Sequence, residues 1–371
     1  MKPPARPDVA LLASGGVDSA VALHLLREAG RTPVAVTLRL ACYSGRDGDG
    51  RPAYSSPARA VESAAELAER LGVPHAVLDI GEDFVRRVID PFAKAYRSGL
   101  TPSPCVYCNP EVKFGFARRF VRSEFGIDVL ASGHYAVVEE RAGAARLFRH
   151  RGLDRDQSYF LYRLAPDDLR RTLFPLAAVG GKDEVRSLAR RLGFAAAEAD
   201  DSMDVCFLPG GEYRELTSPI PSPGPILDTA GREVGRHDGC ANFTVGQRKG
   251  LKKGFGKPMY VVEVIPADNA VVIGAREDVM AGRAAAGNVV AHAADELAPG
   301  ARVFAKIRSG GAARPAVVVR AAGGVLAVDF DDPVFGPAPG QHLVLYDADG
   351  MVLGGGEIMK GETSCQACQA F

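Results

Sequence analysis

The stretch "LLASGGVDSAV", residues 11–21, constrains the fold more than any other part of this 371-residue chain. An apolar strand runs into two glycines, and the pattern of a helix begins directly after them. Glycines let a phosphate approach the backbone, and the unpaired N–H groups at a helix N-terminus favour anions. No lysine follows where a Walker loop requires one. We predict a nucleotide-binding turn of another kind; an ordinary glycine turn without a ligand is the alternative.

The spacing of apolar residues over the first 200 positions predicts an α/β domain. Short apolar runs alternate with amphipathic segments, which is typical of a mostly parallel sheet with helices on both faces. The predicted strands are 8–14, 33–41, 75–80 and 128–135. The predicted helices are 18–30, 58–72, 82–97 and 111–125. The Ser- and Gly-rich segment 43–57 and the cysteine stretch "TPSPCVYCNP" are predicted loops.

Beyond about residue 212 the pattern changes to short strands. "MYVVEVIPADNAVVIG" has the pattern of a hairpin, and a period close to two from about residue 288 predicts a closed or nearly closed barrel. We expect four parts: a nucleotide-binding catalytic domain, a small β-rich central domain, a C-terminal β-barrel and a flexible tail. Their predicted bounds are 1–208, 209–282, 283–360 and 361–371.

Composition narrows the class of protein. The chain is 47% hydrophobic and 24% charged with net charge +0, which is ordinary for a soluble globular protein. No long apolar run or signal peptide is evident, so we expect a cytoplasmic protein without a membrane partner. Seven cysteines are too few for a disulfide framework in so long a chain, and they are expected to be thiols, ligands or catalysts.

The motifs together resemble one family. "SGGVDS" looks like the loop of the PP-loop ATP pyrophosphatases, which split ATP between its α and β phosphates. The later motifs appear in the order seen in the tRNA-specific 2-thiouridylases, and the resemblance covers almost the whole chain. These motifs are "TPSPCVYCNPEVKF", "SGHYA", "RDQSYFL", "KDEVRSLARRLG", "DSMDVCF", "FTVGQRKGL", "PGQ" and "GGGEI".

The resemblance implies an ATP-dependent enzyme that replaces the C2 oxygen of the wobble uridine in tRNA with sulfur. Adenylation would turn that oxygen into a good leaving group, and AMP and pyrophosphate would be released. Mg²⁺ is the expected companion of ATP. The residues implied in ATP binding are Leu12, Ala13, Ser14, Gly15, Gly16, Val17, Asp18, Ser19, Leu38 and Gly133.

The family also implies how sulfur reaches the base. It assigns a persulfide to Cys206 and the partner thiol to Cys108, with a persulfide or sulfide donor protein upstream. A small buried apolar residue is the alternative for Cys206. The two cysteines are far apart in sequence, so the loop near residue 200 is expected to fold over the ATP site.

Cys105 departs from the family pattern, because an aspartate is usual at this position. A thiol accepts protons and hydrogen bonds weakly at neutral pH. Cys105, Cys108 and Cys206 could instead hold a 4Fe-4S cluster, which leaves two mechanisms open. A zinc site would need a fourth ligand. Cys42 and Cys240 are predicted to be structural filler, and Cys365 with Cys368 forms a second CxxC of unassigned role.

A wobble base must leave the anticodon stack to be modified, so the chain needs an RNA-binding surface. The tRNA contacts implied by the resemblance are Ser103, Pro104, Cys105, His134, Arg155, Asp156, Gln157, Arg308, Ser309 and Gln341. A basic stripe adds candidate phosphate contacts, with a solvated face as the alternative. The stripe consists of Arg248, Lys249, Lys252, Lys253 and Lys257.

Two other functions remain open from the sequence. Another PP-loop adenylating ligase would use the glycine loop without Cys108 or Cys206. A non-catalytic RNA-binding relative would keep the fold and lose turnover; the intact "SGGVDS" loop argues against it, and the missing aspartate argues for it.

Overall fold

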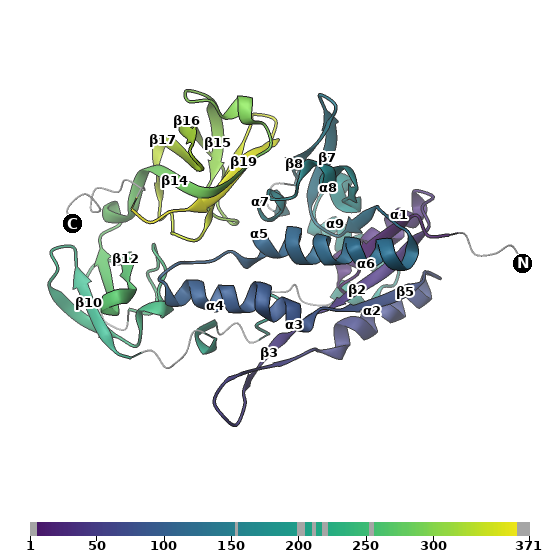
Figure 1. The fold of residues 1–371 in the computed structure, drawn as a ribbon, viewed down its shortest axis with the longest axis horizontal. Helices are drawn as coiled ribbons and strands as arrows, with labels where there is room; N and C mark the ends of the chain where they lie inside the picture. The colour runs from purple at the N-terminus through teal and green to yellow at the C-terminus, as the bar shows by residue number, and fades with distance from the viewer. Residues whose placement is uncertain are drawn as a thin grey trace, which may run out of the picture. The chain divides into compact units, whose positions relative to one another are not determined.

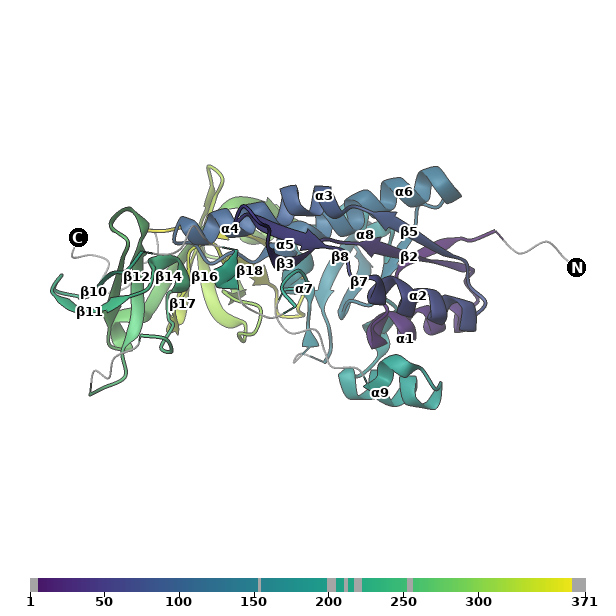
Figure 2. The ribbon, with the colours of Figure 1, turned by 90° about the horizontal axis from the view of Figure 1, so that it is seen from below.

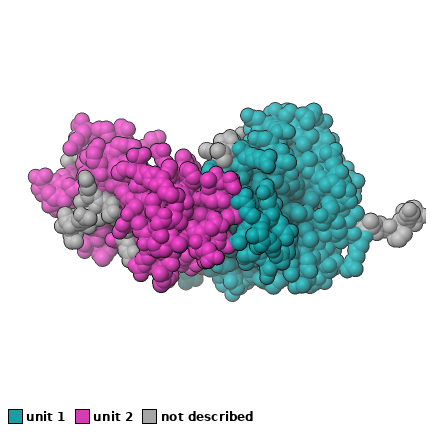
Figure 3. Space-filling view, turned by 90° about the horizontal axis from the view of Figure 1, so that it is seen from above, with its two compact units in different colours: residues 1–89, 105–211 teal, residues 90–104, 212–371 magenta. Residues whose placement is uncertain are grey.

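The computed structural model describes residues 6–152, 155–198, 205–209, 213–216, 222–251 and 256–361. The chain divides into two compact units, one formed by residues 1–89 and 105–211 and the other by 90–104 and 212–371 (Figure 3). Among the helices described, none combines the length and the apolar character that a membrane span needs.

The first unit is built on a five-stranded sheet in the order β5-β2-β1-β6-β9, in which every neighbouring pair is parallel (Figure 1). This confirms the predicted fold class. The central strand is fully buried at Val9 and Leu11, as expected where helices cover both faces of a parallel sheet. The strands are β1 (Val9–Leu12), β2 (Pro33–Arg39), β5 (His75–Asp79), β6 (Leu130–Ser132) and β9 (Thr172–Leu173).

Helices cover this sheet on both sides (Figure 2). Helices α1, α2 and α9 share one apolar core with β1, and Leu23, Leu67 and Val185 are among its buried members. The helices of this unit are α1 (Val17–Glu28), α2 (Ala58–Arg70), α3 (Gly81–Phe84), α5 (Pro104–Cys108), α6 (Gly115–Phe125), α7 (Ser158–Leu161), α8 (Pro166–Arg170) and α9 (Lys182–Arg191). Shorter turns are the π-helices η1 (Val85–Ile89) and η2 (Asn109–Phe114) and the 3-10 helices η4 (Pro175–Ala178) and η5 (Ala195–Glu198).

The strand order reverses next to β1. The chain builds β2 and β5 on one side of β1, and then β6 and β9 on the other. In open α/β sheets, ligands bind outside the carboxyl ends of the strands at such a switch point. The carboxyl ends of β1 and β6 lead into "SGGVDS" and "GHY". The switch point of the sheet therefore lies beside these two loops.

Two predicted loops in this unit are wrong. Segment 43–57 contains the hairpin β3 (Cys42–Arg46) and β4 (Pro52–Ser55). The cysteine stretch is helical, since α5 continues through η2 into α6. Pro104 opens α5, and a proline in the first helical turn loses no hydrogen bond. A second hairpin, β7 (Ala136–Arg141) with β8 (Ala144–Arg149), follows the short β6.

The second unit contains helix α4 (Asp90–Arg97), a four-stranded sheet and a barrel. The predicted hairpin is confirmed as antiparallel β12 and β13, and the predicted barrel is confirmed as six strands closed in the order β14-β17-β16-β15-β18-β19. The sheet strands are β10 (Gly224–Asp228), β11 (Glu233–His237), β12 (Tyr260–Ile265) and β13 (Ala270–Gly274). The barrel strands are β14 (Met280–Ala291), β15 (Arg302–Lys306), β16 (Arg314–Ala322), β17 (Val325–Phe335), β18 (His342–Tyr346) and β19 (Val352–Ile358). The 3-10 helices are η6 (Tyr213–Glu215), η7 (Cys240–Asn242), η8 (Pro266–Asp268), η9 (Glu277–Val279) and η10 (Ala294–Leu297).

Candidate functional site

The glycine loop joins β1 to α1 at the carboxyl edge of the sheet. Gly15 has φ +76°, and a Cβ there would lie 2.9 Å from the carbonyl oxygen of Ala60, so only glycine fits without strain. Ser19 donates its hydroxyl hydrogen to the carbonyl of Gly16 at 2.8 Å, and Ser14 is exposed. Leu12 and Leu38 lie at or near the carboxyl ends of β1 and β2. The loop is a preformed backbone turn that opens at a helix N-terminus.

Asp18 in this loop is held by two residues to which the sequence reasoning gave no role. Tyr135 donates its hydroxyl hydrogen to Oδ1 of Asp18 at 2.7 Å. Lys182, the first residue of α9, pairs with Oδ2 at 2.7 Å, and its side chain is 10% exposed. Lys182 opens the quoted "KDEV" motif and Tyr135 belongs to "GHYA", so both stood within recognised motifs without a predicted contact.

Gly133, which follows β6, packs directly against the glycine loop. A Cβ at Gly133 would lie 3.0 Å from the backbone carbon of Asp18 and 3.1 Å from its Cβ. The next residue, His134, shares a hydrogen bond of 2.8 Å between its Nδ1 and Oγ of Ser132. Burial, together with the positive charge of Lys113, lowers the pKa of His134 to about 3. His134 is therefore neutral at physiological pH.

The thiols of the CxxC motif lie on α5, one helical turn apart. Cys108 is buried at 4% exposure, and Cys105 is partly exposed. Asn109 fixes the following turn because its amide Nδ2 donates to the carbonyl of Phe160 at 3.0 Å. The helix gives both sulfurs a rigid support that a loop would not provide.

The segment that carries Cys206 is hydrogen-bonded to β3 of the same unit. The backbone N–H of Tyr43 donates to the carbonyl of Phe207 at 2.8 Å, and the Phe207 ring packs edge-on against Phe84 at 5.9 Å. The thiol of Cys42 lies 3.6 Å from the carbonyl oxygen of Cys206. Cys42, which was predicted to have only a packing role, therefore contacts the segment that carries Cys206. Cys240, for which the same was predicted, lies in the apolar core of the second unit.

Electrostatics link the sulfurs to one another and to Lys113. Burial, with smaller contributions from Cys206 and Cys105, raises the pKa of Cys108 to about 12. Cys206 is exposed to solvent, but the protein atoms around it still raise the pKa of its thiol to about 11. Lys113 opposes both shifts. The three thiols and one ammonium are close enough to change one another's ionisation.

The described donor set does not form a site for a single metal ion. Within the ranges that the structure describes, no three Cys, His, Asp or Glu side chains converge to hold a metal ion. Cys105, Cys108 and Cys206 thus share an electrostatic neighbourhood without forming a one-metal site such as zinc would need. The described cysteines are free thiols.

The polar groups of Asp156 and Gln157 in the "RDQ" motif form hydrogen bonds within their own unit. The buried carboxylate of Asp156 accepts hydrogen bonds from the backbone N–H groups of His150 at 3.1 Å and Ser158 at 3.0 Å. Gln157 forms two hydrogen bonds with Tyr135. Its side-chain Oε1 accepts from the backbone N–H of Tyr135 at 2.9 Å, and its backbone N–H donates to the Tyr135 carbonyl at 2.8 Å. Arg155 is exposed. The motif therefore braces the tyrosine that holds Asp18.

The remaining predicted RNA contacts lie in the second unit, apart from Cys105. Nε2 of Gln341 donates to the carbonyl of Thr101 at 2.9 Å. Arg308 donates to the carbonyls of Phe335 and Gly336. Ser103, Pro104 and Ser309 are partly exposed. In the basic stripe Arg248, Lys249 and Lys257 are exposed, whereas Lys252 and Lys253, like Cys365 and Cys368, lie outside the described residues.

Family models match most of both units. Residues 7–210 match a family model described as the tRNA methyl transferase HUP domain. Residues 217–275 match the tRNA methyl transferase PRC-barrel domain, and residues 285–358 match the aminomethyltransferase beta-barrel domain.

Three curated relatives carry the name tRNA-specific 2-thiouridylase MnmA. The protein from Paramagnetospirillum magneticum is 40% identical over 96% of this chain and 96% of its own length. The protein from Methylorubrum populi is 41% identical over 97% of this chain and 95% of its own. The protein from Brucella suis is 40% identical over 98% and 94%. The chain therefore belongs to the MnmA family of tRNA-specific 2-thiouridylases and is a tRNA sulfurtransferase.

Proposed function

We propose that this chain uses ATP to activate the C2 oxygen of the wobble uridine and replaces it with sulfur carried on Cys206. One observation carries the proposal: the glycine loop and the thiols belong to one unit and are linked by packing and electrostatic interactions. Asp18 packs against Gly133, His134 follows Gly133, and Lys113 acts on both His134 and the sulfurs.

The nucleotide would lie at the switch point of the sheet. The backbone turn from Leu12 to Ser19 supports binding of the phosphates, with Leu38 and Gly133 on either side. Mg²⁺ would be held mainly by the phosphates and water, because Asp18 is the only carboxylate in this loop and it is already paired. The uridine C2 oxygen would attack the α-phosphorus, pyrophosphate would leave, and the oxygen would carry AMP.

Two thiols suffice for the sulfur step. The terminal sulfur of a Cys206 persulfide would attack C2 and expel AMP, and Cys108 would then attack the Cys206 sulfur to release 2-thiouridine. Alternatively, Cys108 would attack first and release hydrosulfide, which then attacks C2. Both routes end in a Cys108–Cys206 disulfide, so an external thiol must supply two electrons before the next turnover. Neither route needs iron.

Cys105 would take the position of the usual aspartate beside the target base. It is partly exposed and lies one helical turn before Cys108, so it can approach a flipped base without being part of the disulfide. A persulfide or sulfide donor protein would load Cys206, whose exposure to solvent supports such access.

The proposed tRNA contacts fall into two kinds. His134 and Arg155 would touch RNA directly, and the neutral imidazole of His134 would hydrogen-bond or stack instead of pairing with a phosphate. Asp156 and Gln157 would act by shaping the loop, because their polar atoms are engaged internally. In the other unit, the proposed contacts are Ser103, Pro104, Arg308, Ser309 and Gln341, with the exposed part of the basic stripe binding phosphates.

The test is sulfur transfer by the purified chain. The assay contains ATP, Mg²⁺, an unmodified tRNA transcript with uridine at the wobble position, and a cysteine desulfurase with cysteine. Thiolated tRNA is detected by its retardation in a mercury-containing gel. We expect product with the wild type and with the control Cys240→Ala, and none with Cys108→Ala or Cys206→Ala. Product formed without ATP, or by Cys206→Ala, would overturn the proposal.

A further inference from the structure

Lys113 belongs to the quoted motif "TPSPCVYCNPEVKF" but was given no role there. It lies in the π-helical turn η2, five residues after Cys108, while Cys105 precedes Cys108 by one α-helical turn. The wider π-turn brings residues about four to five apart onto one side of a helix. Lys113 is thereby directed to the same side as the two sulfurs, and such turns recur at functional sites.

Lys113 is partly exposed and lies in the chain between two buried apolar residues. Val112 and Phe114 beside it are 0% and 1% exposed, and the Phe114 ring lies 6.2 Å from the ring of His134. Cys206 is held near Lys113 by its neighbour Phe207, whose carbonyl accepts a hydrogen bond from the backbone N–H of Tyr43. An ammonium in such a place needs a negatively charged or strongly polar partner.

The partners that act on Lys113 are sulfurs. Burial acts to lower the pKa of Lys113, but Cys108, Cys105 and Cys206 together raise it above the ordinary value. Glu111 and Cys42 act on the sulfurs themselves, and they raise the pKa values of Cys108 and Cys206 respectively. Among the described side chains that act on both sulfurs, Lys113 is the one that favours their charged form.

We propose that Lys113 is the anion-holding residue of the sulfur site, which binds anionic sulfur as hydrosulfide, persulfide or thiolate between Cys108 and Cys206. The inference rests on the proposed function, since it names the group that receives the sulfur anion. Lys113 forms no covalent bond in this account. Its fixed positive charge offsets the cost of placing a negative sulfur beside the buried Cys108. It is a positioning residue that acts through the sulfurs.

The test compares two alkylating reagents on the free protein. Iodoacetate is an anion and iodoacetamide is neutral, so the ratio of their rate constants at exposed Cys206 reports local positive charge independently of how much thiolate is present. Peptide mass spectrometry resolves Cys206 from the other thiols. A charge at about 4 to 6 Å in water is worth roughly 1 kcal/mol, so we expect the ratio to fall about fivefold in Lys113→Met. Lys113→Arg should keep most of the wild-type ratio.

The matched control is Arg119→Met, which removes an exposed cation that stacks on Phe116 in the same helical run. Its ratio should equal that of the wild type. An unchanged ratio in Lys113→Met, or an equal drop in Arg119→Met, would overturn the inference. Lys113→Gln, with folding checked by circular dichroism, replaces the Met variant if that variant unfolds. Because the assay contains no ATP or tRNA, failure of sulfur transfer would refute the proposed function without changing this result.

Discussion

The Nζ atom of Lys182 lies 2.7 Å from Oδ2 of Asp18, and this ion pair ties the first turn of α9 to the nucleotide loop. Tyr135 holds the other oxygen of the same carboxylate. The loop that would receive ATP is therefore oriented by two elements that follow it in the chain by more than a hundred residues.

Lys182→Met should weaken ATP binding. The substitution removes a largely buried charge partner of Asp18 and a cation close to the expected phosphates. A hydrogen bond to a charged group contributes about 1.5 to 3 kcal/mol, so the Kd for ATP should rise roughly 10- to 100-fold in calorimetry. Arg190→Met is the control, because Arg190 lies on the same helix as Lys182 and its ion pair with Glu198 of η5 is exposed. Equal affinity in both variants would show that Lys182 has no part in the site.

Gly133→Ala should disturb the same loop from the side of β6. The new methyl group would lie 3.0 to 3.1 Å from three atoms of Asp18, which must then move. Overpacking of this kind costs about 1 to 3 kcal/mol, and we expect the Kd for ATP to rise about tenfold. Gly48→Ala, where nothing lies within 4 Å of the added carbon, should bind ATP like the wild type. Unchanged binding by Gly133→Ala would argue against close packing of the two loops.

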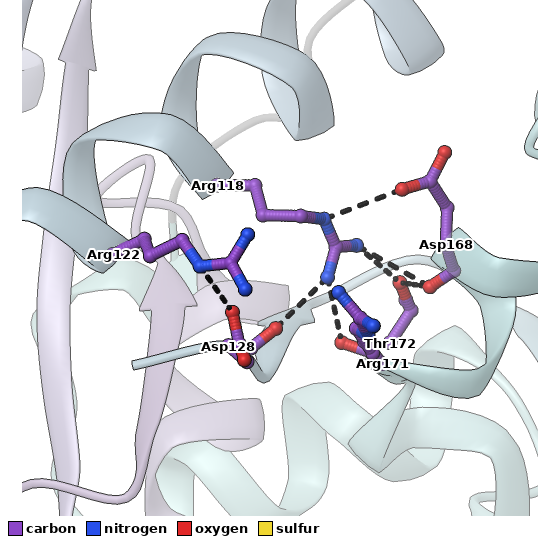
Figure 4. A network of polar contacts seen from close by, with 6 residues as sticks. All are labelled: Arg118, Arg122, Asp128, Asp168, Arg171 and Thr172. Atoms are coloured by element: carbon purple, nitrogen blue, oxygen red, sulfur yellow. Dashed lines mark hydrogen bonds and ion pairs between the residues drawn. The ribbon is translucent and has the colours of Figure 1, made fainter. Parts of the chain in front are cut away.

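Arg118 should matter for stability more than its neighbour Arg122. Its guanidinium donates to the carbonyls of Asp128 at 2.9 Å and Asp168 at 3.3 Å and to Oγ1 of Thr172 at 3.3 Å, which ties α6 to the segments around β6 and β9 (Figure 4). Arg118→Met should lower the free energy of unfolding by about 3 kcal/mol in urea titration. Arg122→Met removes an exposed pair with Asp128 and should cost less than about 1 kcal/mol. Equal losses would refute this ranking.

His134 should make stability depend on pH below neutrality. Its pKa is about 3 in the folded chain and 6.5 ordinarily, so between these values the unfolded chain binds a proton that the folded chain does not. The stabilisation is complete above pH 6.5 and is lost as pH falls. At pH 5 the loss should reach roughly 2 kcal/mol. His134→Gln should therefore show a shallower decline between pH 7.5 and 5, and a parallel decline in both proteins would contradict this.

Sequence patterns predicted the glycine loop, the parallel sheet and the barrel because each depends on local periodicity or on a short motif. The helical form of the cysteine stretch was not predicted, since its prolines were taken as loop formers although Pro104 lies where a helix tolerates one. The β3–β4 hairpin was missed because its glycine- and serine-rich residues lack an alternating apolar pattern.

Contacts between distant segments were the harder part of the site. Nothing local in the sequence indicates that Lys182 pairs with Asp18 or that Cys42 contacts the Cys206 segment. The resemblance implied Asp156 as a tRNA contact, and no local pattern indicated that its carboxylate accepts backbone hydrogen bonds inside the fold. Lys113 had a usable signal, because it lies five residues after Cys108 in a stretch already singled out for its chemistry.

The most direct test of the account is one turnover without reductant. The chain with persulfide loaded on Cys206 is mixed with ATP, Mg²⁺ and the tRNA transcript, and the products are quantified by nucleoside analysis and non-reducing peptide mapping. The account predicts one Cys108–Cys206 disulfide for each 2-thiouridine formed, with Cys105 and Cys42 still reduced. Formation of 2-thiouridine while Cys108 and Cys206 remain free thiols, or a disulfide that contains Cys105, would contradict it.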